Sequence, residues 1–119
     1  MTFDELDILL REEVQAAIEA NIERDPLRAA LDRAGVASSA VASAVKYLQR
    51  ARRKLPSYYA ARCVVPQRAF EQSSSEETAA HKRGEGAHCL DLTCGLGVDA
   101  YYLSKRFARV TTVERDEVL

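Results

Sequence analysis

The stretch from Leu90 to Asp116, LDLTCGLGVDAYYLSKRFARVTTVERD, constrains the fold more than any other part of this 119-residue chain. With the residues just before it, it runs from a short apolar segment (AHCLDL) through a glycine turn (TCGLG) and a helix-like segment (VDAYYLSKRF) to a β-branched segment (ARVTTVE). Strand, turn, helix and strand in about 30 residues make one βαβ unit, and such units build parallel sheets. The second half of the chain therefore predicts the beginning of an α/β domain.

The first half predicts helices. Residues 4–22 carry apolar side chains at steps of three and four, which places them on one helical face: Leu6, Leu10, Val14, Ala17 and Ile18. A second, short helix has Asp25 as its N-cap, Pro26 at its first position and Gly35 after its last turn.

A third helix is predicted in SSAVASAVKYLQRARRKLP. Ser38 or Ser39 caps its start, and it has to end before Pro56, because the residue preceding a proline disfavours helical geometry. Its expected apolar face is formed by Val41, Val45, Tyr47 and Leu48. We expect these three helices to pack as a small bundle over about residues 3–54.

The middle of the chain is less regular. Residues 56–70 are broken by Pro66 and predict an irregular connector with one short helical turn. The serine run that follows offers a capping box, formed by Ser73 with Glu76 or by Ser74 with Glu77. A helix to about residue 82, closed by Gly84, follows from that signal.

These patterns divide the chain into three parts. Residues 1–55 form a helical N-terminal domain, residues 56–84 a connector with a capping helix, and residues 85–119 the truncated first βαβ unit of an α/β domain. The predicted fold is therefore mainly α overall, an α-helical bundle followed by the start of a Rossmann-like sheet.

Composition narrows the functional classes. Apolar residues make up 47% and charged residues 29%, which is typical of a globular protein. No apolar run approaches the ~20 residues needed to cross a bilayer, and the acidic N-terminus is unlike a targeting peptide. We expect a cytoplasmic protein with no membrane partner and no metal. Three cysteines form no paired motif, and the two histidines lack ligand spacing: Cys63, Cys89, Cys94, His81 and His88.

The glycine turn is the candidate binding loop. Gly95 and Gly97 allow positive φ angles and close backbone approach to a ligand, and Glu114, at the end of the second strand, can accept both hydroxyls of a ribose. Thr93, however, stands where a first glycine would complete the dinucleotide fingerprint, and the carboxylate of Asp91 would repel a pyrophosphate. A cofactor with a cationic amino-acid end, such as S-adenosylmethionine, suits this loop better.

These residues resemble a known family. CLDLTCGLGVDAYYLS looks like motif I of class I S-adenosylmethionine-dependent methyltransferases, and VTTVERD looks like their second-strand motif. RKLPSYYAARCVVPQRAFEQSSSEETAAHK resembles the segment before motif I in bacterial proteins assigned as RNA methyltransferases with a C-terminal THUMP-like domain. The resemblance implies that Asp91, Thr93, Gly95 and Gly97 line the methionine part of the cofactor, that Glu114 holds its ribose, and that Ser73, Ser74 and Ser75 close over its carboxylate end.

Each assignment has a plainer alternative. The glycines can be ordinary βα-turn residues, Glu114 a solvated strand end, and the serines helix caps. The run QRARRK (49–54) can contact RNA or can simply be a basic helix C-terminus. The two tyrosines at 101 and 102 are expected in the core. At the level of function, the alternative is a helical RNA- or protein-binding module with an incidental βαβ tail.

The family's fold has seven strands, of which this chain supplies two. The resemblance therefore implies the N-terminal fragment of an enzyme that methylates RNA, with the catalytic residues in segments outside these 119 residues. We expect the fragment alone to be inactive and, because its strands have few neighbours, to associate with itself.

Overall fold

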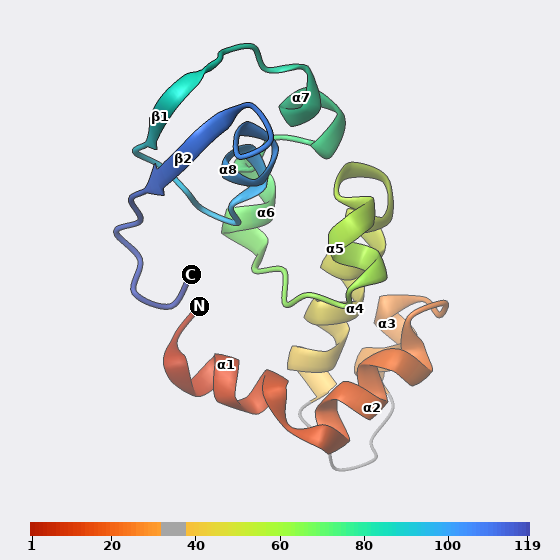
Figure 1. The fold of residues 1–119 in the computed structure, drawn as a ribbon. Helices are drawn as coiled ribbons and strands as arrows, with labels where there is room; N and C mark the ends of the chain where they lie inside the picture. The colour runs from red at the N-terminus through yellow and green to blue at the C-terminus, as the bar shows by residue number, and fades with distance from the viewer. Residues whose placement is uncertain (32–37) are drawn as a thin grey trace.

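The computed structural model describes residues 1–31 and 38–119. Within those ranges it is elongated, with principal extents of 53 × 26 × 21 Å. Figure 1 shows the strands and α8 at one end, α1–α3 at the other, and α4 between them. The chain is mainly helical with a small parallel sheet, in the predicted order of helices first and βαβ unit last. No described helix is both long and apolar enough to cross a membrane.

The first predicted helix is two helices, α1 (Phe3–Leu10) and α2 (Glu12–Asn21). The chain breaks at Arg11, whose ψ of 139° is extended. Thr2 and Glu5 form a capping box that begins α1. The break changes the predicted apolar face, because Leu9 is buried while Leu10 is 60% exposed. A continuous helix would have turned Leu10 inward together with Val14.

Two further helices follow as predicted. In α3 (Pro26–Leu31) the Asp25 carboxylate accepts a hydrogen bond from the Leu27 N–H. Gly35, its predicted stop, lies outside the described residues. Helix α4 (Ser38–Lys54) ends before Pro56 as expected, and its predicted face is buried: Val41, Val45, Tyr47 and Leu48. Ser38 and Ser39, the expected caps, are already helical.

The middle of the chain is more regular than predicted. Instead of an irregular connector it forms α5 (Pro56–Ala60) and α6 (Gln67–Gln72). Helix α7 (Glu76–His81) is capped by Ser75, which accepts a hydrogen bond from the Thr78 N–H, so neither predicted capping box forms. Both predicted pairs were one or two residues too early, because any of the three consecutive serines could have supplied the cap.

One hydrophobic core runs through both halves of the chain. Leu55 and Val45 are its largest fully buried side chains, and it continues from α1 and α2 to Phe70, Ala79 and Val98. Because Val98 begins α8, the βαβ unit packs on the same core as the helices. This continuity fixes the position of the glycine turn relative to the helical half.

The second half forms the predicted βαβ unit. Strand β1 (Gly86–Asp91) and β2 (Phe107–Thr112) pair in parallel, with Cys89 opposite Val110 and Asp91 opposite Thr112. Helix α8 (Val98–Leu103) connects them. Tyr102 is partly buried against the core, but Tyr101 is 55% exposed, so its predicted core position is wrong. Tyr101 lies on the solvent side of a helix too short to bury both rings.

Arg62, which follows α5, has a φ of +53° and is the one described non-glycine residue with positive φ. Its guanidinium group reaches Glu19 of α2 at 2.8 Å and donates to the Tyr59 carbonyl oxygen at 2.7 Å. The chain reverses direction there and turns towards α6.

Candidate functional site

The turn between β1 and α8 has the backbone that its glycines predicted. Gly95 and Gly97 have φ values of +52° and +75°, which side-chain-bearing residues rarely adopt. A Cβ built on Gly95 would meet no atom within 4 Å, so the space above this residue is open. The Gly97 N–H donates to the Cys94 carbonyl oxygen at 2.8 Å, which closes the turn.

Glu114 lies beside this turn, two residues beyond the end of β2. Its Oε2 accepts from the Gly95 N–H at 2.7 Å, and its Oε1 accepts from the N–H groups of Arg115 and Asp116 at 2.9 and 3.0 Å. The backbone N–H groups of Asp116, Gly95 and Arg115 hold the pKa of this carboxyl below its usual value. Glu114 is thus ionised and fixed against the glycine turn.

The turn and Glu114 border a hollow of about 510 Å³. Of the predicted site residues, the hollow brings together Ser73, Ser74, Thr93, Gly95 and Glu114. Asp91, Gly97 and Ser75 do not line it. Asp91 and Gly97 lie one layer back, where they shape the ends of the turn, and Ser75 serves as the cap of α7.

The three serines have separate partners. The hydroxyl of Ser73 donates to the Phe70 carbonyl oxygen at 2.9 Å, and that of Ser74 donates to Asp99 at 3.0 Å. Of the three serines, only Ser74 therefore hydrogen-bonds to the βαβ unit among the described residues. The predicted closure by all three serines reduces to two lining side chains, of which one is tied to α8.

Two carboxylates near the hollow each have one oxygen without a donor. Asp91 Oδ1 accepts from the Thr93 N–H at 3.0 Å, and Asp99 Oδ2 contacts Lys82 Nζ at 2.7 Å. The other oxygens, Asp91 Oδ2 and Asp99 Oδ1, are buried and have no hydrogen-bond partner within the described ranges. A buried carboxylate oxygen is stabilised by a donor.

Several lining residues were missed by the sequence analysis. Asp99, Arg68 and Gln72 border the hollow from α8 and α6. The sequence offered a signal for Asp99, because an acid in the first turn of the helix after a glycine loop faces that loop. Such an acid is easily taken for a residue that only complements the helix dipole. Arg68 had no signal, because residues 56–70 were expected to be irregular, and no local pattern marked Gln72.

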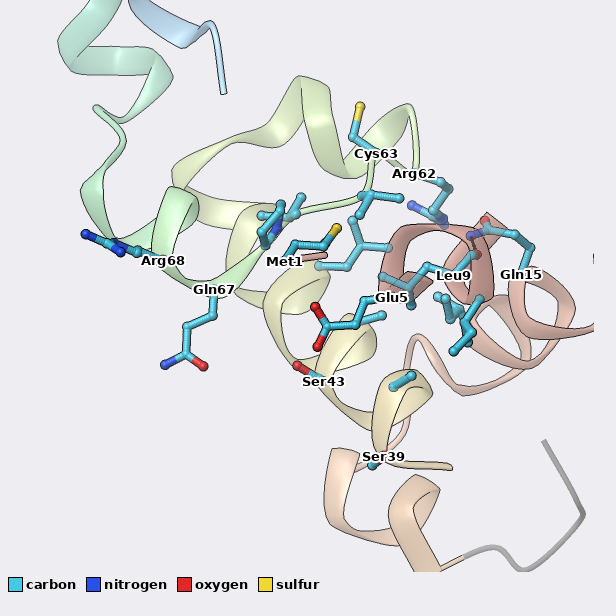
Figure 2. A pocket seen from close by; sticks show the side chains of 18 of the residues that line it. Met1, Glu5, Leu9, Gln15, Ser39, Ser43, Arg62, Cys63, Gln67 and Arg68 are labelled. Atoms are coloured by element: carbon cyan, nitrogen blue, oxygen red, sulfur yellow. Dashed lines mark hydrogen bonds between the residues drawn. The ribbon is translucent and has the colours of Figure 1, made fainter. Parts of the chain in front are cut away.

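A second hollow of about 680 Å³ lies over the helical half and shares Met1, Pro66 and Arg68 with the first. Figure 2 shows Glu5, Leu9 and Gln15 on one side of it and Gln67 and Arg68 on the other. None of the predicted site residues lines it.

The basic run 49–54 is largely occupied within the molecule. Gln49 donates to the carbonyl oxygens of Ile22 and Arg24, and Lys54 donates to that of Phe70. Arg50 also forms an ion pair with Glu71 at 3.8 Å, and Arg52 one with Glu23 at 3.6 Å. Most of this run therefore holds α4 to its neighbours.

This geometry can be compared with known proteins. No protein-family model matches the chain, and no curated protein matches it. One solved structure does, described as a "putative methyltransferase from Porphyromonas gingivalis W83", with 30% sequence identity and a TM-score of 0.71 over 98% of this chain. The chain spans 30% of the length of that protein. The architecture described above, helices followed by a parallel βαβ unit, is thus similar to part of a methyltransferase structure.

Proposed function

We propose that this chain forms the S-adenosylmethionine-binding part of a methyltransferase whose acceptor is RNA. The observation that carries the proposal is the hollow beside the glycine turn, where an ionised Glu114 and an open Gly95 lie together. The likeness to a methyltransferase structure supports the reaction class. The sequence motifs support the choice of methyl donor.

The residues present fit this cofactor. A hollow of about 510 Å³ is within the usual range of small-molecule sites, about 300–1,000 Å³. Asp99, which lines the hollow and has one carboxylate oxygen without a hydrogen-bond partner among the described residues, suits a ligand that carries an ammonium group. Arg68 supplies a cation at the same hollow for the cofactor's carboxylate.

In this proposal Glu114 holds the ribose. Its Oε2 accepts one backbone N–H and retains a lone pair for a hydroxyl. Its fixed position means that little further ordering is needed on binding. When bound, S-adenosylmethionine supplies an electrophilic methyl group, and the residues of this chain bind and orient that donor. The residues that act on the acceptor are not assigned.

RNA as the acceptor class is supported by the sequence resemblance. Arg53 and Lys46 are exposed on α4, and Arg68 is exposed at the rim shared by the two hollows. A phosphate backbone would be attracted to such cations, with an affinity that falls as salt rises. Filter binding of a mixed-sequence RNA at several salt concentrations tests this part; binding that does not depend on salt would contradict it.

Cofactor binding is tested by three variants in a calorimetric titration with S-adenosylmethionine. Glu114→Ala should weaken binding about tenfold, through loss of charge-assisted hydrogen bonds to the ribose. Gly95→Val should abolish binding, because a β-branched residue disfavours a φ of +52° and its side chain fills the open space. Glu117→Ala, an exposed acid three residues further on, is the matched control. Equal affinity in all three variants would refute the proposed site.

A further inference from the structure

The helical half of the molecule reaches directly into the glycine turn. The hydroxyl of Tyr58, in α5, donates to the carbonyl oxygen of Leu96 at 2.6 Å. Leu96 lies between the two positive-φ glycines, 38 residues further along the chain. A residue of the helical half therefore bonds the backbone of the candidate cofactor loop itself.

This bond fixes one end of a peptide group whose other end is also fixed. The described peptide bonds are all trans, so the Leu96 carbonyl and the Gly97 N–H point in opposite directions. The Gly97 N–H donates to the Cys94 carbonyl oxygen at 2.8 Å, while Tyr58 holds the carbonyl. Glycines on both sides of Leu96 give this segment more conformational freedom than any other residue type would. The two bonds together restrict it to one orientation.

The backbone just before Tyr58 is also held in place. Glu76, 6% exposed, accepts hydrogen bonds from the N–H and hydroxyl of Ser57, both at 2.8 Å, and from the hydroxyl of Tyr102 at 3.1 Å. Glu76 thus links the start of α5 to α8, on either side of the turn. Burial, followed by the nearby Cys63 and Glu76, raises the pKa of Tyr58, so the hydroxyl remains a donor at neutral pH.

Tyr58 lies outside the lining of the hollow, whereas Leu96 belongs to it. The bond therefore directs the Leu96 carbonyl towards the helical side and away from the cofactor space. A carbonyl oxygen turned the other way would lose its bond to Tyr58 and would present a negative dipole to the hollow that the carboxylate of Glu114 also lines.

We infer that Tyr58 is a positioning residue for the cofactor loop: its hydroxyl holds the Leu96 carbonyl so that the Gly95–Gly97 turn is preformed for S-adenosylmethionine. This inference rests on the proposed function. It assigns α5 a part in cofactor binding, although no residue of that helix lines the hollow.

The test replaces Tyr58 by phenylalanine, which keeps the ring and removes only the hydroxyl. Tyr59→Phe is the matched control, because it removes the hydroxyl of the next residue in the same helix, which donates to Glu23 at 3.1 Å and not to the loop. S-adenosylmethionine is titrated into the full chain and both variants, with NMR detection so that weak binding is measured. The carbonyl carbon shift of Leu96 and the amide exchange of Gly97 are recorded without cofactor, and thermal melts verify folding.

We expect Tyr58→Phe to raise the Kd about fivefold, to move the Leu96 carbonyl signal and to speed Gly97 exchange, with Tyr59→Phe matching wild type in all three. Wild-type affinity in Tyr58→Phe would overturn the inference and leave the proposed function intact. So would an unmoved Leu96 signal with a lower melting temperature, because the role would then be structural alone. Absence of binding by the wild type would overturn the proposed function, and this inference with it. If Tyr58→Phe fails to fold, the slow exchange of Gly97 in the wild type decides, since an unprotected Gly97 amide contradicts a preformed turn.

Discussion

Replacing Glu76 by alanine should destabilise the whole molecule, although the side chain belongs to a helix of only six residues. Its carboxylate is buried and accepts three hydrogen bonds, from the Ser57 N–H, the Ser57 hydroxyl and the Tyr102 hydroxyl. The alanine variant removes all three acceptors. The two hydroxyls can rotate to other partners, but the Ser57 N–H is fixed by the backbone and stays unpaired.

The cost follows from these contacts. A hydrogen bond to a charged acceptor contributes about 1.5–3 kcal/mol, and a buried unpaired donor costs about 1–3 kcal/mol. Because the three bonds share one carboxylate, they are not additive, and we expect a total loss of about 3 kcal/mol. With an unfolding entropy of about 2.1 cal/mol/K per residue over a chain of this length, the melting temperature should fall by about 12 °C.

Circular dichroism melts and urea titrations of Glu76→Ala measure this loss. Glu76→Gln, which keeps the shape and one acceptor oxygen, should lose about 1 kcal/mol. Glu77→Ala is the control, because Glu77 is exposed and occupies the same first turn, so it carries a similar interaction with the helix dipole. If Glu76→Ala and Glu77→Ala have the same melting temperature, the Glu76 carboxylate does not join α5 to α8 in the way described.

Four other outcomes are expected. Leu48→Asp should unfold the chain, because an unpaired buried charge costs several kcal/mol, whereas Leu27→Asp, at a site 73% exposed, should leave the circular dichroism melt nearly unchanged. Gly84→Ala should lower the free energy of unfolding, measured by urea titration, by about 1–2 kcal/mol, because φ is +142° and the new Cβ would stand 3.0 Å from the Phe107 ring; an unchanged free energy of unfolding would show that the ring gives way freely. Because the pKa of Glu114 is lowered in the folded state, its ionised carboxylate stabilises that state above the ordinary carboxyl pKa. This stabilisation is lost as the pH falls through the lowered pKa. The amide shift of Gly95 should therefore titrate below pH 4.5, together with the carboxyl carbon of Glu114. The chain should associate at micromolar concentration through its two-stranded sheet, where Leu90 and Leu92 are 56% and 67% exposed; light scattering should show Leu90→Lys shifted towards the monomer, and a monomeric wild type would rule the association out.

Sequence predicted the parts of the fold in which the hydrophobic period and the flanking proline or glycine residues indicate the same element. Helix α4 has a continuous apolar face and a proline just beyond its end, and it forms within those limits. The βαβ unit changes period at its glycines and pairs in parallel as expected. The break at Arg11 had no such signal, because no proline or glycine marks it. It follows from tertiary packing, which buries Leu9 in place of Leu10.

The candidate site likewise contains residues whose positions sequence could predict and residues whose positions it could not. The proximity of Gly95 and Glu114 was predictable because it depends on backbone geometry at fixed places in a βαβ unit, and the Gly95 N–H lies 2.7 Å from Glu114 Oε2. Their part in cofactor binding stays a prediction. The contacts of Tyr58 and Glu76 were not predictable, since they join segments 38 and 26 residues apart and no local pattern encodes such distances. Asp99 was visible in the sequence, but only the position of Lys82 and Ser74 shows that it lies at the hollow.

The conformation at residue 62 limits which amino acids can occupy it. The backbone, with φ at +53°, suits glycine or asparagine, whereas the pairing with Glu19 needs a long side chain with a planar, forked cation. No amino acid meets both requirements without cost. Glycine would relax the turn and release α2, lysine would keep the strain and lose the fork, and arginine retains the contact at the expense of the backbone. Few amino acids can therefore replace the residue that fastens α2 to the connector, although it is only partly buried and does not line the hollow beside the glycine turn.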